Sequence, residues 1–204
     1  MFFSIYNKFK IKNWRKLSKG KRQKVLQKVE NKQAKKLHRP ALPIVINTDP
    51  NWHCFGMFEN KKGKKLLHLS INLLTKPELR FHALETIIHE GRHAYQHHVI
   101  SKRKLGVFSF KEKRWKRNYM GYISSKEDSA FYSMQPIEHD AQKYAIKTMN
   151  KFRFKFKNER DYHITIENMV NRLESSEQEL KDRHGIFYRS AINRKIRKKS
   201  SGRF

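Results

Sequence analysis

Apolar residues recur at helical spacing in four stretches of the chain, which predicts four helices. The first covers about residues 18–38 and ends before Pro40, because the residue before a proline avoids helical geometry. The second begins at Thr75, which has the spacing of a capping box with Glu78, and runs to about residue 100. The other two cover about residues 136–149 and 162–184.

Between the first two helices the pattern changes to short runs that are rich in β-formers. They are separated by Asp49-Pro50 and by Asn60-Lys-Lys-Gly63, which are turn sequences. We therefore expect a small, mostly antiparallel sheet of three strands over about residues 43–47, 52–59 and 65–74. The fold class that follows is α+β.

Three further segments have no clear helical period. Residues 101 to about 134 are predicted to form a loop. Residues 151–157 alternate basic and aromatic side chains, which fits a strand, a frayed helix end, or a surface that stacks single-stranded nucleic acid; we favour a structural role. Residues 189–204 are basic and are predicted to be a mobile tail.

The charge of the chain is strongly unbalanced. Among 204 residues there are 47 Lys plus Arg against 18 Asp plus Glu, a formal net charge of +29. Such a potential attracts nucleic acid, anionic membranes or acidic proteins, although a solvated basic surface needs no partner. Cys54 is the only cysteine, which excludes an intrachain disulfide and indicates a reducing compartment. Apolar runs stay short of the roughly 20 residues of a spanning helix, so we expect a cytoplasmic protein.

The strongest chemical signal is the run Ile-Ile-His-Glu-Gly-Arg-His-Ala-Tyr-Gln-His over residues 87–97. His89 and His93 are four residues apart, so on a helix their imidazoles project from one face and can bind one metal ion. Glu90 lies beside them, where it can act as general base on a zinc-bound water. The pattern predicts one catalytic Zn²⁺ ion. The competing interpretation is a histidine-rich helix surface, because further histidines lie nearby.

A catalytic zinc ion takes a third protein ligand and leaves a position for water. The helix predicted over residues 136–149 offers Glu138, with His139 and Asp140 as alternatives. At 100° per residue Glu138 lies about 60° from the centre of the apolar face and Asp140 about 100°, which favours Glu138. Gln142, one turn later, is a candidate to orient a ligand through a hydrogen bond.

These segments, His89-Glu90-Gly-Arg-His93 and Glu138-His-Asp140-Ala-Gln142-Lys-Tyr144-Ala145, together with the order of the elements, resemble the ImmA/IrrE-like metallopeptidases among the gluzincin-like zincins. The resemblance covers about residues 17–150. It implies a minimal zincin-like core of an N-terminal helix, the sheet, the His-Glu-Gly-Arg-His helix and a ligand helix, with zinc bound by His89, His93 and Glu138. Some relatives cut repressor proteins. The chain departs from the pattern at Gly91-Arg92, where relatives often carry a bulkier residue followed by Gly.

The resemblance and the charge pattern divide the chain into four regions. They are a basic and aromatic lead over residues 1–16, a zincin-like domain over 17–150, a helical extension over 151–188 and the basic tail over 189–204.

A peptide in a zincin-type site pairs with an edge strand. We expect this strand to include Phe55, Gly56 and Met57, where the glycine allows close approach. Transition-state stabilisation has four candidates that the sequence does not separate: Tyr95, His97, Tyr132 and Tyr144.

The features together predict a zinc-dependent metallopeptidase that hydrolyses a peptide bond. Its positive potential favours an acidic protein substrate or a repressor bound to DNA. Two alternatives stay open: a basic nucleic-acid-binding protein with a structural or inert histidine-rich metal site, and a hydrolase that cuts a non-peptide amide.

Overall fold

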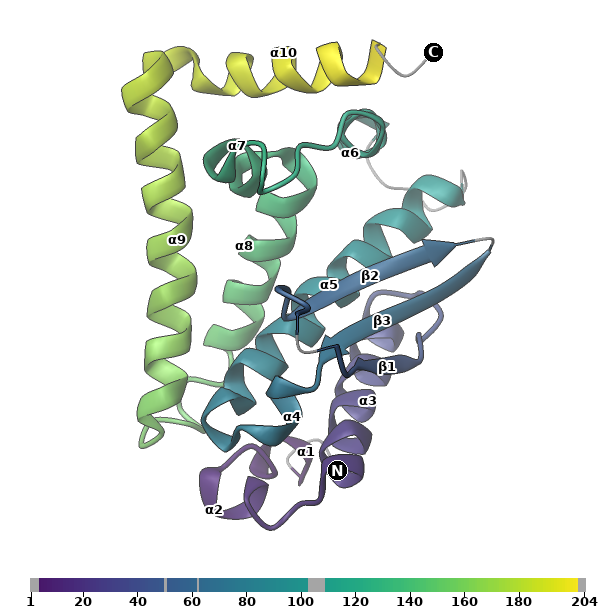
Figure 1. Cartoon of the computed structure of the whole chain (residues 1–204), viewed down its shortest axis with the longest axis vertical. Helices are drawn as coiled ribbons and strands as arrows, with labels where there is room; N and C mark the ends of the chain where they lie inside the picture. Colours follow the sequence, from purple (N-terminus) through teal and green to yellow (C-terminus); the bar gives the residue numbers. More distant parts are fainter. Residues whose placement is uncertain (1–3, 50, 62, 103–108, 202–204) are drawn as a thin grey trace. The chain divides into compact units, whose positions relative to one another are not determined.

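The computed structural model describes residues 4–49, 51–61, 63–102 and 109–201 (Figure 1). Helices predominate and three strands form a small sheet, so the predicted α+β class is confirmed. The chain divides into two compact units, Met1–Tyr95 with Tyr144–Ile166 and Gln96–Lys143 with Glu167–Phe204. Parts of the predicted lead, turns, loop and tail, namely residues 1–3, 50, 62, 103–108 and 202–204, lie outside the described residues. None of the described helices is long and apolar enough to cross a membrane.

The first unit begins with two short helices, α1 (Ser4–Asn7) and α2 (Ile11–Trp14). Phe9 and Trp14 are fully buried and stack at 5.0 Å between ring centroids. The guanidinium of Arg80 donates to the Phe9 carbonyl at 2.8 Å and pairs with Glu159 and Asp161. The described part of the predicted lead therefore contributes Phe9 and Trp14 to the core of this unit.

Helix α3 (Lys19–Lys36) agrees with the first predicted helix, and the Ser18 hydroxyl caps it by accepting from the Lys21 N–H. Its inner face carries the fully buried Glu30, whose two carboxylate oxygens accept from the Arg39 guanidinium at 2.6 and 2.8 Å. The N–H of Leu42 donates to the same carboxylate. The buried charge is thus both paired and hydrogen-bonded, as a buried carboxylate requires.

The sheet consists of β1 (Ile44–Asn47), β2 (Gly56–Lys61) and β3 (Lys64–Ser70) in the order β1-β3-β2. β2 and β3 form the expected antiparallel hairpin, in which Gly56 lies opposite Leu69. β1 and β3 are parallel, so the sheet is mixed and the prediction of a mostly antiparallel sheet was wrong. β3, with Leu67 and Leu69 fully buried, takes the central position, so β1 pairs with β3 instead of forming a hairpin with β2, the next strand in the sequence. This leaves β2 as an edge strand.

The next helix starts later than predicted. Thr75 ends the short helix α4 (Asn72–Thr75), because its hydroxyl donates back to the Ile71 carbonyl instead of capping the residues that follow. A 3-10 turn, η1 (Pro77–Leu79), intervenes, and α5 (Arg80–Ser101) begins after it. The predicted end of this helix, near residue 100, agrees with the structure.

The prediction of a loop over residues 101–134 was wrong, because this segment contains α6 (Ser109–Met120) and α7 (Ser129–Met134). The predicted third and fourth helices are present as α8 (Pro136–Asn150) and α9 (Arg160–His184). Residues 151–158 between them form consecutive turns, so the strand alternative for 151–157 was also wrong.

After the turn η2 (Gly185–Phe187), the chain forms α10 (Tyr188–Ser201) where the sequence predicted a mobile tail. Three side chains at intervals of four residues, Tyr188, Ile192 and Ile196, are buried along one face of this helix. Within the second unit α10 contacts α6. Gly121, at the end of α6, leaves room for this contact, because a Cβ there would lie 2.1 Å from the Ile196 carbonyl oxygen.

Candidate metal centre

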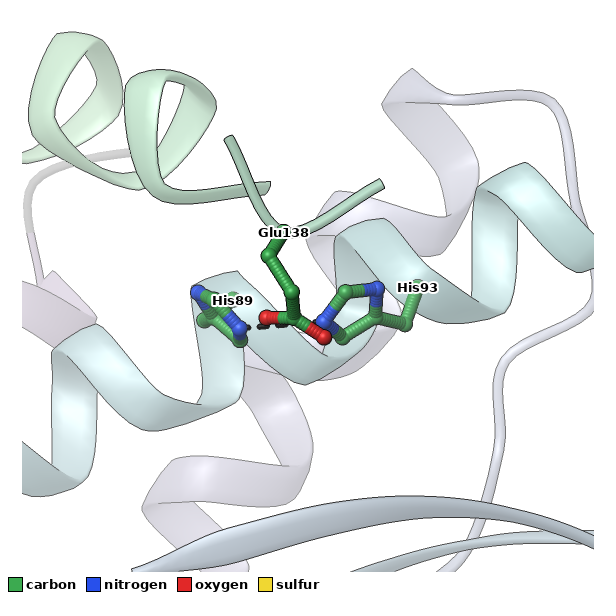
Figure 2. A group of neighbouring side chains, drawn as sticks. All are labelled: His89, His93 and Glu138. Carbon is green, nitrogen blue, oxygen red and sulfur yellow. Dashed lines mark hydrogen bonds between the residues drawn. The ribbon is translucent and has the colours of Figure 1, made fainter. Parts of the chain in front are cut away.

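Helix α5 brings His89 and His93 together. Their Nε2 atoms lie 3.0 Å apart, in a hydrogen bond whose donor depends on the ring tautomers (Figure 2). Two nitrogen ligands of a tetrahedral zinc ion, each about 2.0–2.1 Å from it, are roughly 3.3–3.4 Å apart. The two imidazoles therefore need to move only slightly to share an ion.

Glu138 is the third member of the group. One potential ligand atom from each of His89, His93 and Glu138 lies within 4.8 Å of the other two, and Figure 2 shows the carboxylate pointing toward the imidazoles. Glu138 is 2% exposed and lies in the first turn of α8, where the helix dipole stabilises a negative charge. Two imidazoles and one carboxylate are a donor set that suits a divalent transition metal. The group could therefore hold a metal ion.

The alternative ligands have other surroundings. The Asp140 carboxylate accepts from the Gln96 amide at 2.9 Å and pairs with Lys111 at 2.8 Å. The predicted orienting residue Gln142 is buried, and its Oε1 has no hydrogen-bond partner among the described residues. His139 lies on α8 next to Glu138, and burial lowers its pKa, as do the nearby Lys143 and Arg189.

Glu90, the predicted general base, is held by the sheet. Its Oε2 accepts from the backbone N–H of Phe58 in β2 at 2.8 Å, and the residue is 8% exposed. This contact is close because β2 lies directly against α5 at Gly56. A Cβ on Gly56 would lie 2.3 Å from Cγ2 of Thr86 and 3.1 Å from Cγ of Glu90. The sequence suggested that Gly56 makes room for a substrate, whereas in the structure it makes room for the helix.

The neighbours of Gly56 face solvent. Phe55 is 47% and Met57 44% exposed, and the Phe55 ring lies 5.6 Å from the His82 ring. Together with the edge position of β2, this gives an accessible strand next to Glu90. Whether a substrate uses it stays a prediction.

Tyr122 is a site residue that the sequence did not reveal. Its hydroxyl donates to Oε1 of Glu138 at 2.9 Å. Burial raises the pKa of Tyr122, and the neighbouring Glu138 carboxylate raises it further, so the phenol stays protonated and acts as the donor. No pattern in the sequence indicates this contact, because Tyr122 lies in a segment without apolar periodicity.

A buried amide network holds the backbone on both sides of this contact. The Gln135 side chain accepts from the Ile123 N–H at 3.1 Å and donates to the Ile123 carbonyl at 2.8 Å. It also accepts from the Asn118 amide at 2.7 Å, and Asn118 in turn accepts from the Ile137 N–H at 3.0 Å. Gln135 and Asn118 are fully buried. The residues next to Tyr122 and Glu138 are therefore fixed by the same two amides.

Ion pairs connect Glu127 and Asp128, which lie between α6 and α7, to the C-terminal helices α9 and α10. Lys199 of α10 contacts Glu127 at 2.6 Å, and Arg183 of α9 contacts Asp128 at 2.9 Å. Burial alone would raise the pKa of Asp128, but hydrogen bonds from Arg183 and from the Phe131 N–H outweigh it and lower the pKa to about 2. Asp128 also caps α7.

The candidate transition-state residues are distributed over several contacts. Tyr95 and Tyr144 both contact the guanidinium of Arg92, at 4.6 and 4.8 Å from their ring centroids. Burial raises the pKa of Tyr144. The ring of Tyr132 lies 6.1 Å from that of Tyr122, and the ring of His97 lies 6.3 Å from that of Tyr119. Of the four candidates, Tyr132 thus contacts the tyrosine that binds Glu138.

Gly91 lies on the side of α5 opposite the two histidines. It is two residues from each histidine, so it lies about 180° round α5 from the midpoint between them. A Cβ at this position would lie 2.9 Å from Nη2 of Arg39 and 3.2 Å from Oε2 of Glu30. A residue with a side chain at this position would displace the buried Glu30–Arg39 ion pair.

Comparisons of the chain with models of protein families, with curated proteins and with solved structures found no match.

Proposed function

We propose that the protein is a zinc-dependent metallopeptidase in which His89, His93 and Glu138 hold the ion and Glu90 is the general base. The observation that supports this most is the convergence of two imidazoles and one carboxylate within 4.8 Å. Two histidines and one glutamate are also the ligands of a well-known class of catalytic zinc sites. A zinc ion held there would polarise a carbonyl group and lower the pKa of water.

The neighbours of Glu90 suit the role of a base. The hydrogen bond from the Phe58 N–H orients the carboxylate, and the low exposure of Glu90 shields it from bulk water. A carboxylate in this position can accept a proton from the attacking water and deliver it to the leaving amine. Orientation by the backbone of a strand leaves the base with little conformational freedom, which favours proton transfer.

The proposed substrate is an extended, acidic segment of a protein. β2 is an edge strand, so its outer side can add a further strand by backbone pairing. The net charge of +29 attracts acidic sequences. The resemblance of the two ligand segments to the ImmA/IrrE-like metallopeptidases agrees with cleavage of a regulatory protein, including a repressor bound to DNA.

The first test is metal content together with cleavage. Purified full-length protein should contain about one zinc ion per chain by elemental analysis. Glu90→Gln should keep the ion but lower the rate of cleavage by about 100-fold or more, because general-base catalysis contributes roughly 10²–10⁴-fold. His93→Ala should lose the ion. The control is Glu174→Gln, which changes an exposed carboxylate of α9 and should leave both properties unchanged.

The cleavage probes are fluorescein-labelled casein, an acidic protein, and a complex peptide mixture read by mass spectrometry. Equal cleavage by wild type and Glu90→Gln would contradict the role of Glu90. A chain that binds zinc but cuts neither probe would indicate a structural metal site, and a chain that binds no zinc would refute the whole proposal.

A further inference from the structure

The turn segment between α8 and α9 presents one aromatic ring to solvent. The Phe156 N–H donates to the Phe152 carbonyl at 3.2 Å, so these two residues, four apart, lie on the same face. Phe156 is buried against Phe81 and Tyr162, at 4.9 and 5.0 Å between ring centroids. Phe154, two residues away from each, is 90% exposed. The inner rings thus anchor the segment and leave Phe154 on the surface.

Phe152 adds a second anchor. Its ring lies 4.0 Å from that of Tyr6 in α1. The ammonium group of Lys155 lies near both rings, 5.4 Å from the centroid of Tyr6 and 5.9 Å from that of Phe152. The turn segment and the N-terminal helices are therefore held side by side by aromatic contacts.

Phe154 lines an open hollow of about 440 Å³ that belongs to the first unit. α2 and the residue before it contribute Lys12 and Lys10, and the turn segment contributes Lys155 and Lys157. Two amide side chains, those of Asn7 and Asn158, complete the polar lining together with Glu159. The Glu159 carboxylate is paired with Arg80 at 2.6 Å, so it adds no uncompensated negative charge. The hollow is positively charged.

Within the described part of the chain, Lys10, Lys12 and Lys157 have no ion-pair partner. The same unit contains further lysines. Lys32 lies 5.3 Å from the centroid of Tyr6. Burial lowers the pKa of Lys36, and the adjacent ammonium groups of Lys151 and Lys147 lower it further, which reflects crowding of like charges. An anionic partner would relieve this repulsion.

We propose that the basic-aromatic surface, formed by Lys10, Lys12, Phe154, Lys155 and Lys157, binds single-stranded nucleic acid. The lysines contact phosphates, and a base stacks on the exposed ring of Phe154. Interleaved cations and aromatic rings are the usual elements of sequence-tolerant single-strand binding. The proposal is independent of the metal centre, since it uses none of its residues.

The shape and lining of the hollow favour a nucleotide over an anionic membrane. Its volume of about 440 Å³ falls in the range of about 300–1,000 Å³ that is typical of pockets for small ligands. Asn7 and Asn158 also line the hollow, and an asparagine side chain can both donate to and accept from a base edge. A planar bilayer would not fill a concave, polar hollow, and a single exposed phenylalanine offers little apolar area for insertion.

The test measures binding of the full-length protein to fluorescein-labelled oligo(dT) by fluorescence anisotropy at several salt concentrations. The variant Lys12→Ala/Lys157→Ala lowers the net charge from +29 to +27, as does the control Lys113→Ala/Lys116→Ala on the exposed side of α6. Loss of two phosphate contacts should reduce the slope of log K against log salt by about 1.4, because each contact on a single strand contributes about 0.7. The control should keep the wild-type slope.

Phe154→Ala should weaken binding about 5- to 150-fold, the range that corresponds to the loss of one stacked base. Phe154→Leu should weaken it nearly as much, because leucine keeps the apolar surface but cannot stack. Phe187→Ala, at another exposed phenylalanine (69% exposed), is the matched control and should bind as wild type does. All these side chains face solvent, and an unchanged circular dichroism spectrum checks the fold of each variant.

Two results would overturn the proposal. If both double-lysine variants lost the same affinity for oligo(dT) and Phe154→Ala had no effect, binding would depend only on the overall charge. Binding to vesicles of phosphatidylcholine and phosphatidylserine that depends on Phe154 but survives Phe154→Leu, with no oligonucleotide binding, would identify the partner as a membrane.

Discussion

Removal of the Tyr122 hydroxyl should weaken metal binding without disrupting the fold. In Tyr122→Phe the hydrogen bond of 2.9 Å to Oε1 of Glu138 is lost, while the ring and its packing against Tyr132 remain. The bond exists before any ion enters, so its contribution to metal affinity is that the Glu138 carboxylate is already ordered. In the variant, that ordering must occur during metal binding.

The size of the effect follows from side-chain entropy. Ordering a glutamate side chain costs up to about 1.5–2 kcal/mol. At about 1.4 kcal/mol per factor of ten, this corresponds to an affinity roughly 10- to 30-fold lower. The value lies within the roughly 10- to 100-fold loss that is usual when a group supporting a metal ligand is removed.

The assay is competition for zinc between the protein and a chromophoric chelator of known affinity. Tyr188→Phe is the matched control, because the Tyr188 hydroxyl also donates to a glutamate, Oε1 of Glu177 in α9, at 2.7 Å. Glu177 is not one of the three proposed metal ligands. Both variants should lose a similar amount of folding stability, whereas only Tyr122→Phe should lose zinc affinity. Equal zinc affinities for wild type and Tyr122→Phe would show that Tyr122 does not orient Glu138 for binding.

Three further outcomes are expected for stability. Gly56→Ala should lower the free energy of unfolding in urea by about 1–3 kcal/mol through overpacking against Thr86, and adding Thr86→Ser should recover part of the loss; an unchanged midpoint would refute the close contact. Glu30→Ala should cost about 3–5 kcal/mol in the same assay because it leaves Arg39 buried without its partner, and a loss below 1 kcal/mol would be inconsistent with that pairing. Asp128, whose pKa is lowered to about 2, stabilises the fold above about pH 4, and this contribution, about 1–2 kcal/mol after allowance for solvent screening, is lost as pH falls through about 2. The melting temperature of Asp128→Asn should therefore depend less on pH than that of the wild type between about pH 4 and 2, and parallel curves would contradict the assignment.

Local periodicity accounts for most of what the sequence could predict. The i, i+4 spacing of His89 and His93 and the position of Glu138 on the inner face of its helix are properties of single helices, and in the structure these three residues lie together. The hairpin of β2 and β3 also follows from a local turn sequence. Such features need no knowledge of the tertiary fold.

Contacts between distant segments account for what the sequence could not predict. The Tyr122 contact depends on the amide of Gln135, which holds the neighbouring Ile123 from 12 residues away in the chain, and no periodic pattern encodes such a contact. Thr75 could cap a following helix or bond to a preceding turn, and only tertiary packing decides between them. In α10 the spacing of Tyr188, Ile192 and Ile196 was a usable signal, but the surrounding basic residues obscured it.

The contact at Gly91 determines how α5 is rotated about its own axis. Gly91 is the one residue of the His-Glu-Gly-Arg-His segment without a Cβ. Any of the other four residues of the segment would bring a Cβ against the Glu30–Arg39 pair if it took the place of Gly91. Rotation of the helix by one residue, about 100°, is therefore sterically blocked. The ion pair and the missing side chain thus set the rotational register of α5 against α3. The directions in which the two imidazoles point therefore depend on packing at the opposite side of α5, where neither histidine takes part in the contact.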